Sequence, residues 1–235
     1  PDDRFSKRVI ARLLARPRLL DMEKHPVRVV WDEIRAALAD YELVDGDEIE
    51  DDQVAKSHAL DNYGKSYRVN ERQVLRTQTT DTLWLAMTGR SPPVRLLTAG
   101  RVFRQIRQDK DHTKVFHQAD AVCIDRHANR DALKATVTAL LKKLLGNKPT
   151  RWRPARLRIV NDPQLAVVKT KTGWLDVVGA GLLKPRTLRQ AGYDAGADTG
   201  FAFGLGIERL AMIKFGIDDI RTLWQPPYVA TVSSH

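Results

Sequence analysis

The 235 residues are enough for one large domain with a substantial core, and the hydrophobic (43%) and aromatic (7%) content excludes a disordered chain. Thirty-nine Lys and Arg against 29 Asp and Glu give a formal net charge of +10, which favours nucleic acid or nucleotide phosphates as partners and also fits a merely solvated surface. The single cysteine, Cys123, excludes internal disulfides. No apolar run approaches the roughly 20 residues that span a bilayer, so we expect a cytoplasmic protein without membrane contact.

The N-terminal quarter of the chain contains two predicted helices. Residues 5–20 place apolar positions at helical spacing among Lys and Arg, with Pro17 as an interruption. We expect residues 1–24 to form a basic helical extension, either a packing appendage or a contact for a membrane surface or RNA. Residues 25–235 are expected to form the main domain. Apolar residues repeat at helical spacing from Pro26 to Leu38, and Pro26 is well placed to begin that helix.

The middle of the chain is rich in predicted strands. The acidic segment 42–52 predicts a strand, a turn and a charged loop, and residues 66–69 and 73–79 read as extended. A helix is expected near residues 80–88, ending at Gly89. Residues 91–106 and 114–125 are β-rich runs joined by a polar loop, which predicts a long antiparallel hairpin. Residues 129–145 predict an amphipathic helix that ends before Gly146.

The C-terminal part alternates short strands with two helices. Strands are expected at residues 156–160, 165–170 and 173–181, a helix near 185–192, and a glycine-rich segment at 200–206 that leads into a helix. Strands therefore come in consecutive hairpin-like runs rather than in strict alternation with helices. This order predicts an α+β fold, an antiparallel sheet flanked by helices, and argues against a doubly wound nucleotide-binding fold.

One group of candidate binding residues lies on the predicted hairpin. Arg104 ends its first strand, and Phe116 and Gln118 share a face of the returning strand. A guanidinium can hold a phosphate with paired hydrogen bonds, and an aromatic ring can stack on a purine. The alternative is an ordinary sheet surface with Phe116 in the core.

A second candidate group follows the glycines Gly200, Gly204 and Gly206. They lead into a helix that begins near Ile207, so that backbone can approach a ligand closely and Arg209 lies in the first helical turn. A glycine-rich strand packed under a neighbour is the alternative, because a glycine pattern alone is weak evidence.

Together the two groups resemble motifs 2 and 3 of the class II aminoacyl-tRNA synthetases. TAGRVFR, the loop residue His112, FHQ, GWLDVVGAG, FAFGLGIERLAM and KFGIDDIR occur in an order and separation most similar to synthetases of the phenylalanyl type, over about residues 25–224. The resemblance implies an antiparallel catalytic sheet, ATP bound in a bent form, Mg²⁺, and aminoacylation in two steps through an adenylate.

The resemblance also implies roles for residues in the ATP site. Arg104 would grip the α-phosphate, Arg209 the γ-phosphate, and His112 would assist at the β- and γ-phosphates. Phe116 would stack on adenine, with Gly206 beside the nucleotide, and Asp176 occupies the place of a glutamate suited to magnesium. The glutamate that commonly reads the adenine amino group falls at Ile106, so base recognition is expected to be looser or to use backbone groups.

Other residues correspond to the substrate pocket of the family. Gln118 and Asp120 match the pair that holds the substrate ammonium group, which favours an α-amino acid, and Gln78 and Thr80 would lie beside it, near Gly204. Arg158 and Val160 stand at the two aromatic positions that surround the substrate ring. A charge entering the pocket there would disfavour phenylalanine and favour a polar or anionic substrate, whereas an Arg158 pointing to solvent would leave that choice open.

Three functions remain after these comparisons of residues. The first is a free-standing enzyme that makes an aminoacyl adenylate and passes it to an acceptor other than tRNA. This function is favoured because no residues match an anticodon-binding domain. A tRNA-charging catalytic subunit is the second, favoured by the basic charge, and a non-catalytic binding or regulatory module is the third. The resemblance further implies a homodimer that pairs through residues 27–49.

Overall fold

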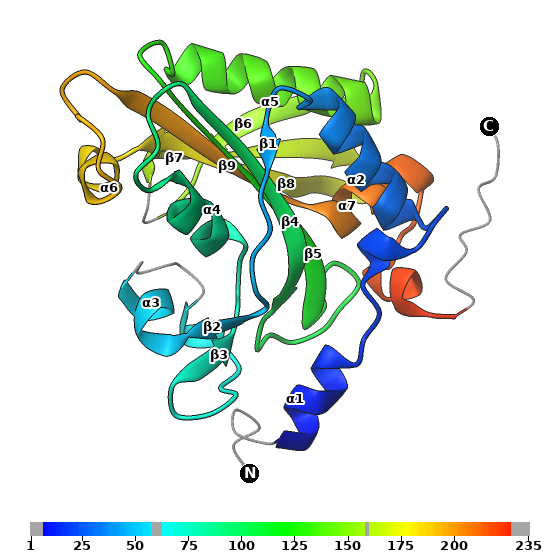
Figure 1. Ribbon diagram of the computed structural model, residues 1–235. Helices are drawn as coiled ribbons and strands as arrows, with labels where there is room; N and C mark the ends of the chain where they lie inside the picture. Colours follow the sequence, from blue (N-terminus) through cyan, green and yellow to red (C-terminus); the bar gives the residue numbers. More distant parts are fainter. Residues whose placement is uncertain (1–6, 58–62, 158–159, 227–235) are drawn as a thin grey trace.

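A single seven-stranded sheet forms the centre of the molecule in the computed structural model, which describes residues 7–57, 63–157 and 160–226 (Figure 1). Its neighbouring strands are antiparallel except for β1, which runs parallel to β4. Across the sheet the order is β1 (Glu42–Leu43), β4 (Val94–Phe103), β5 (Val115–Asp125), β9 (Thr199–Gly206), β8 (Gly173–Leu183), β7 (Val160–Thr170) and β6 (Thr150–Pro154). The predicted α+β fold with an antiparallel sheet flanked by helices is confirmed.

Three helices cover one face of this sheet (Figure 1): α2 (Pro26–Ala37), α5 (Arg130–Leu145) and α7 (Ile207–Phe215). Local sequence fixes their ends, because Pro26 opens α2, the Asn129 side chain accepts a hydrogen bond from the Ala132 amide, and Gly146 ends α5 at a positive φ of 69°. Their apolar faces form the largest core cluster with the sheet, in which Val30 and Ile34 are fully buried. The helices predicted at residues 26–38 and 129–145 are confirmed.

The opposite face of the sheet is covered only in part. The helices α4 (Thr80–Met87) and α6 (Pro185–Gln190) pack there through a second core cluster that contains Leu83, Leu188 and Ile124. A small sheet of β2 (Ile49–Asp51) and β3 (Gln73–Leu75), the helix α3 (Asp52–Ser57) and the short helix η3 (Tyr63–Lys65) complete this side. Residues of β5, β7, β8 and β9, with Arg104 directly after β4, are thereby left to line a pocket.

The N-terminal segment packs against the rest of the molecule. Helix α1 (Lys7–Leu14) ends shortly before Pro17, as the sequence predicts, and buries Ile10 and Leu13 against Leu75 and Phe103. The short helix η2 (Leu19–Asp21) adds Leu19 to the main core, and η4 (Ile220–Trp224) follows α7. In the described part of the chain, no helix is long and apolar enough to cross a membrane.

Two predictions of extended structure differ from the observed strands. The strand expected at residues 156–160 begins only at Val160, and residues 155–157 lie outside any strand. The edge strand β6 was not predicted, because its alternating Arg and Trp residues between prolines lack an apolar periodicity. In the segment 66–69, Arg68 forms an isolated bridge to Val74 rather than part of a longer strand.

Candidate active site

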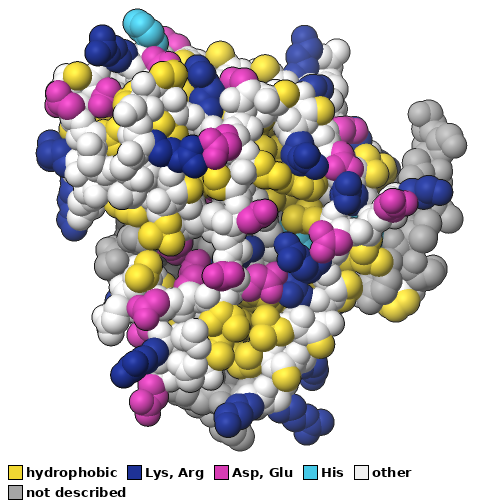
Figure 2. Space-filling view, in the orientation of Figure 1, with side chains coloured by type: hydrophobic (Ala, Val, Ile, Leu, Met, Phe, Trp, Pro, Cys, Tyr) yellow, Lys and Arg dark blue, Asp and Glu magenta, His cyan; other side chains and the backbone are white. Residues whose placement is uncertain are grey.

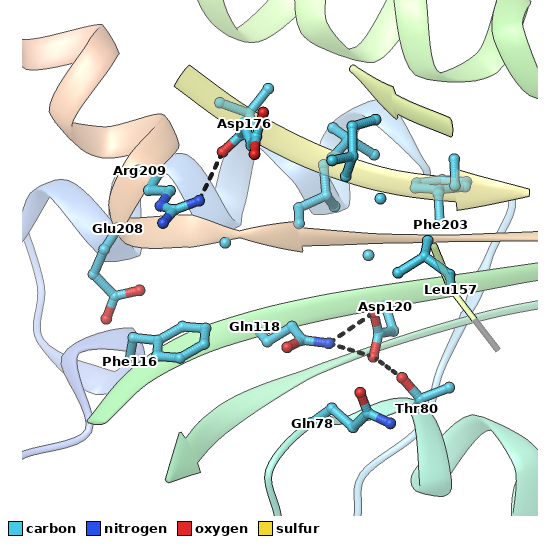
Figure 3. Close-up of a pocket in the computed structure, with 18 of the residues that line it drawn as sticks. Gln78, Thr80, Phe116, Gln118, Asp120, Leu157, Asp176, Phe203, Glu208 and Arg209 are labelled. Carbon is cyan, nitrogen blue, oxygen red and sulfur yellow. Dashed lines mark hydrogen bonds between the residues drawn. The ribbon is translucent and has the colours of Figure 1, made fainter. Parts of the chain in front are cut away.

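A pocket of about 300 Å³ opens on the partly covered face of the sheet (Figure 3). Every predicted site residue within the described part of the chain lines it: Gln78, Thr80, Arg104, His112, Phe116, Gln118, Asp120, Val160, Asp176, Gly204, Gly206 and Arg209. Ile106 lines it as well, whereas Arg158 lies outside the described residues. The two groups of candidate residues therefore meet in one cavity, although they are about 100 positions apart in the chain.

Arg104 enters the pocket directly after β4. Its Nε donates to the Thr77 carbonyl at 2.8 Å, its Nη2 donates to Gln118 Oε1 at 2.8 Å, and the guanidinium carbon lies 4.8 Å from the centre of the Phe116 ring. Burial lowers the pKa of Arg104 to about 10, with the Asp120 charge opposing this shift and the Arg209 charge adding to it. Arg104 therefore remains a cation at neutral pH and feels the charge of Arg209 across the pocket.

Arg209 is held by a set of neutral acceptors. Its guanidinium donates to the backbone carbonyl of Asp176 at 3.1 Å, to that of Asp111 at 3.3 Å, and to His112 Nε2 at 3.0 Å. Because a guanidinium cannot accept a hydrogen bond, Nε2 of His112 must carry the lone pair, and its Nδ1–H donates to Asp109 at 2.9 Å. The His112 ring is thus assigned as neutral in this arrangement. Desolvation by burial lowers the pKa of Arg209.

A buried carboxylate lies deeper in the same pocket (Figure 3). Asp120 Oδ2 accepts hydrogen bonds from the hydroxyl groups of Thr79 and Thr80, both at 2.8 Å, and the Gln118 amide donates to both oxygens at 3.1 and 2.9 Å. Burial raises the pKa of Asp120, against which these hydrogen bonds act. A Cβ atom on Gly204 would lie 2.2 Å from Asp120 Oδ1, so this glycine makes room for the carboxylate.

Beside the carboxylate, the described lining of the pocket is apolar. The side chains of Leu83, Leu157, Val160, Leu165 and Ala202 line this recess. A Cβ atom on Gly179 would meet Leu157 at 3.4 Å and Leu165 at 3.6 Å. Leu157 was missed in the sequence because the strand expected around it does not form, so that its side chain turns into the pocket (Figure 3).

Asp176 lines the pocket, but its carboxylate has a partner. Arg153 Nη2 donates to its two oxygens at 2.7 and 2.9 Å, while its backbone carbonyl accepts from Arg209. Among the described residues there is no group of three or more His, Cys, Asp or Glu side chains that could hold a metal ion. The magnesium assignment to Asp176 therefore rests on a single carboxylate that Arg153 already neutralises.

A buried pair of residues joins the two candidate groups. Glu208 is 1% exposed, and its oxygens accept from the His117 amide at 2.9 and 2.8 Å and lie 2.8 Å from His117 Nδ1. The His117 ring stacks on Trp224 with a centroid distance of 5.6 Å. Since Glu208 precedes Arg209 and His117 lies between Phe116 and Gln118, this contact fixes β5 against α7. Apart from the position of both residues within the motifs, no periodicity or spacing predicted this contact.

Fold and site together define the catalytic core of a class II aminoacyl-tRNA synthetase: an antiparallel sheet whose open face carries one arginine from a hairpin and another from the helix after a glycine-rich strand. The family model described as "tRNA synthetases class II core domain (F)" matches residues 12–232, and the chain belongs to this family. The resemblance inferred from the motifs is thereby confirmed.

Curated relatives of the chain are ligases of the phenylalanyl type. The chain is 31% identical over 226 residues to a phenylalanine–tRNA ligase alpha subunit from Clostridium perfringens, covering 86% of this chain and 66% of that subunit. It is 34% identical to subunits of the same name from Prochlorococcus marinus, over 210 residues, and Syntrophus aciditrophicus, over 223 residues, covering 86% of this chain and 63% and 66% of those subunits. The chain spans about two thirds of the length of these relatives.

Proposed function

We propose that this chain uses ATP to activate an α-amino acid, or a related carboxylic acid, as an aminoacyl adenylate. The observation that carries the proposal is the convergence of Arg104 and Arg209, which come from separate elements, on one pocket that also contains the buried carboxylate of Asp120. Two cations suit a triphosphate, and the carboxylate suits an ammonium group.

In the proposed reaction, a carboxylate oxygen of the substrate attacks the α-phosphorus of ATP. The bond between that phosphorus and the bridging oxygen to the β-phosphate breaks, and pyrophosphate leaves. The attacking carboxylate is already ionised at neutral pH, so no general base is required. Arg104 is assigned to the α-phosphate, where its charge would stabilise the developing negative charge. Its present acceptors, Thr77 and Gln118, are neutral and would be replaced by a charged phosphate.

The remaining contacts to ATP are assigned to the entrance of the pocket. Phe116 would stack on adenine, while Arg209 and His112 would bind the β- and γ-phosphates, with Gly206 close to the nucleotide. To donate to a phosphate through Nε2, His112 must release Arg209 and carry a proton on Nε2, because Nε2 now accepts from Arg209 and the Nδ1–H is bound to Asp109.

Magnesium, the metal expected in this family, usually binds one or two carboxylates together with substrate phosphates. Asp176 fits that role as one carboxylate beside Arg209, provided that Arg153 is displaced from it. When bound, the metal would neutralise phosphate charge. Arg209 is held in place without it, by hydrogen bonds to the Asp176 and Asp111 carbonyls and to His112.

The described pocket favours an amino acid with an apolar side chain. Asp120, Gln118 and Thr80 would receive the ammonium group, and Gln78 would lie beside it. The recess next to them presents Leu157, Val160 and Leu165, which would stabilise an apolar side chain, and these described residues offer a charged one no partner.

A tRNA-charging catalytic core is the second candidate for the complete activity. The names of the relatives, phenylalanine–tRNA ligase alpha subunits, support tRNA as the acceptor. The proposal of adenylate formation does not depend on this choice, since transfer to tRNA or to another acceptor follows the same first step.

Amino-acid-dependent exchange of labelled pyrophosphate into ATP tests the proposal. A panel of all common amino acids should give exchange with at least one apolar member, and Arg104→Ala should lower the rate by about 100-fold or more. Arg95→Ala, which changes an arginine of the opposite sheet face that pairs with Asp40, is the matched control and should retain exchange. Silence across the panel, with ATP binding also absent, would favour the non-catalytic module. Retention of labelled amino acid on bulk tRNA then separates tRNA from other acceptors.

A further inference from the structure

The pocket face of the sheet continues past β8 onto β7 and the edge strand β6. Arg151 of β6 and Asp176 of β8 are both register partners of Val167, and Lys169 of β7 is the partner of Trp174. Because side chains alternate along a strand and cross-strand partners share a face, Arg151, Lys169 and Trp174 lie on the same face as Asp176, which lines the pocket.

This edge surface, defined by Lys148, Arg151, Arg153, Lys169, Lys171 and Trp174, combines an aromatic ring with cations. Trp174 is 39% exposed, which makes it one of few large hydrophobic side chains of the described chain that face solvent. The guanidinium carbon of Arg151 lies 4.1 Å from the centre of its ring, and Lys169 Nζ lies 5.7 Å from it. Such a stack offers a flat surface, either the free part of the ring or the outer plane of the guanidinium.

The charged side chains that define the edge surface are all positive. Lys148, Arg151, Lys169 and Lys171 form no ion pair with any carboxylate of the described residues, and only Arg153 is paired, with Asp176. On the face of the molecule drawn in Figure 2, by contrast, basic and acidic side chains are interspersed. The edge surface therefore concentrates part of the net charge of +10 around an exposed aromatic ring.

We propose that the edge surface binds single-stranded RNA, with a base stacked on the Trp174–Arg151 pair and phosphates bound by the surrounding lysines. Unpaired bases offer the flat faces that such a platform needs, whereas a duplex buries them and an acidic peptide has none. Asp176 connects this surface to the pocket through Arg153 on one side and Arg209 on the other. A bound strand would thus lie next to the pocket, and the choice of RNA as the acceptor rests on the proposed function.

Fluorescence anisotropy with a labelled single-stranded oligoribonucleotide of about 12 nucleotides tests the binding. The titration contains neither ATP nor amino acid, so it does not depend on adenylate formation. Trp174→Ala should weaken binding by roughly 5- to 150-fold, the effect of one lost stacking platform, and Trp174→Phe should restore most of it. Lys169→Ala with Lys171→Ala should lower the slope of log K against log salt concentration by about 1.4, since each phosphate contact on a single strand contributes about 0.7.

Lys142→Ala with Lys143→Ala on α5, which covers the opposite face of the sheet, removes the same charge and is the control. It should leave both the affinity and the Trp174 dependence close to those of the unchanged protein. Unchanged binding by Trp174→Ala would overturn the proposal, as would an equal loss in the control. So would duplex RNA or polyglutamate that binds as tightly and with the same dependence on Trp174. Pyrophosphate exchange by Trp174→Ala is expected to be normal, so failure here is distinguishable from failure of the proposed function.

Discussion

Replacing Asp120 by Asn separates binding of the amino acid from binding of ATP. The substitution keeps the shape of the side chain and removes the charge that faces the proposed ammonium group, while Thr79 and Thr80 can still donate to the remaining oxygen. An ammonium group left without its partner in a buried site costs about 3 to 5 kcal/mol, which corresponds to roughly 150- to 5,000-fold in affinity. The KM for the amino acid in pyrophosphate exchange should rise accordingly, and the KM for ATP should stay within about twofold.

The same substitution has an opposite effect on stability. Burial raises the pKa of Asp120 in the folded state, so its contribution to stability is present below the pKa of the unfolded chain and is lost as pH rises through the folded pKa. At neutral pH the burial of this carboxyl group is therefore a cost, and Asp120→Asn should unfold at an equal or higher temperature, with the difference shrinking toward pH 4. A variant with an unchanged KM for every amino acid that the protein activates would refute the assignment of Asp120. A KM change confined to ATP would refute it as well.

Further substitutions test other parts of the site. Gly204→Ala places a methyl group 2.2 Å from Asp120 Oδ1, so it should cost about 1–3 kcal/mol in urea unfolding and raise the amino-acid KM; normal values of both would contradict the close approach. Arg153→Ala should lower the magnesium concentration for half-maximal exchange and Asp176→Asn should raise it, whereas equal magnesium curves would remove Asp176 from the metal site. Leu157→Ala enlarges the recess and should shift the preferred amino acid toward bulkier apolar side chains; an unchanged preference across the panel would place the side chain of the substrate elsewhere. Burial raises the pKa of Glu50 from 4.5 to about 8, so the stability that this group contributes is lost as pH rises from 4.5 to about 8, and Glu50→Gln should gain stability of about a few kcal/mol at pH 9 and almost none at pH 4.

The elements with strong local signals could be predicted from the sequence. Pro26 and the helical repeat after it predicted the position of α2, and Gly146 predicted the end of α5. The long β4–β5 hairpin followed from two apolar runs around a polar loop, and its register brings Val102 opposite Phe116. The pocket residues Gln118, Asp120 and Arg209 were named by the resemblance to the class II motifs, and all three line the one pocket.

The parts that could not be predicted depend on contacts between distant segments. Nothing local to Leu157 indicates that the chain leaves the strand direction there and turns a side chain into the pocket. Likewise, Arg153 has no periodic signal, and its pairing with Asp176 requires that β6 lie at the sheet edge. The contact between Glu208 and His117 joins residues 91 positions apart, so it depends on the folded sheet rather than on the motifs themselves.

The homodimer, and the division into an extension of residues 1–24 and a main domain of residues 25–235, stay predictions. Helix α2 buries Val27, Val30 and Ile34 in the chain's own core, mainly against α7, so these side chains are used within one protomer. A dimer through residues 27–49 would have to use the remaining surface of this segment, including the exposed side chain of Leu43. Light scattering at several concentrations tests it, with a constant monomer mass as the contradicting result.

Adenylate formation as proposed requires Arg104 and Arg209 to act on one triphosphate. The decisive measurement is rapid-quench analysis of adenylate formation from labelled ATP in a single turnover, at a series of ATP concentrations. We predict that Arg104→Ala lowers the rate at saturating ATP by about 100-fold or more, and that Arg209→Ala chiefly raises the ATP concentration needed for half-maximal rate. Adenylate formation by both variants with the rate and ATP dependence of the unchanged protein would contradict the account.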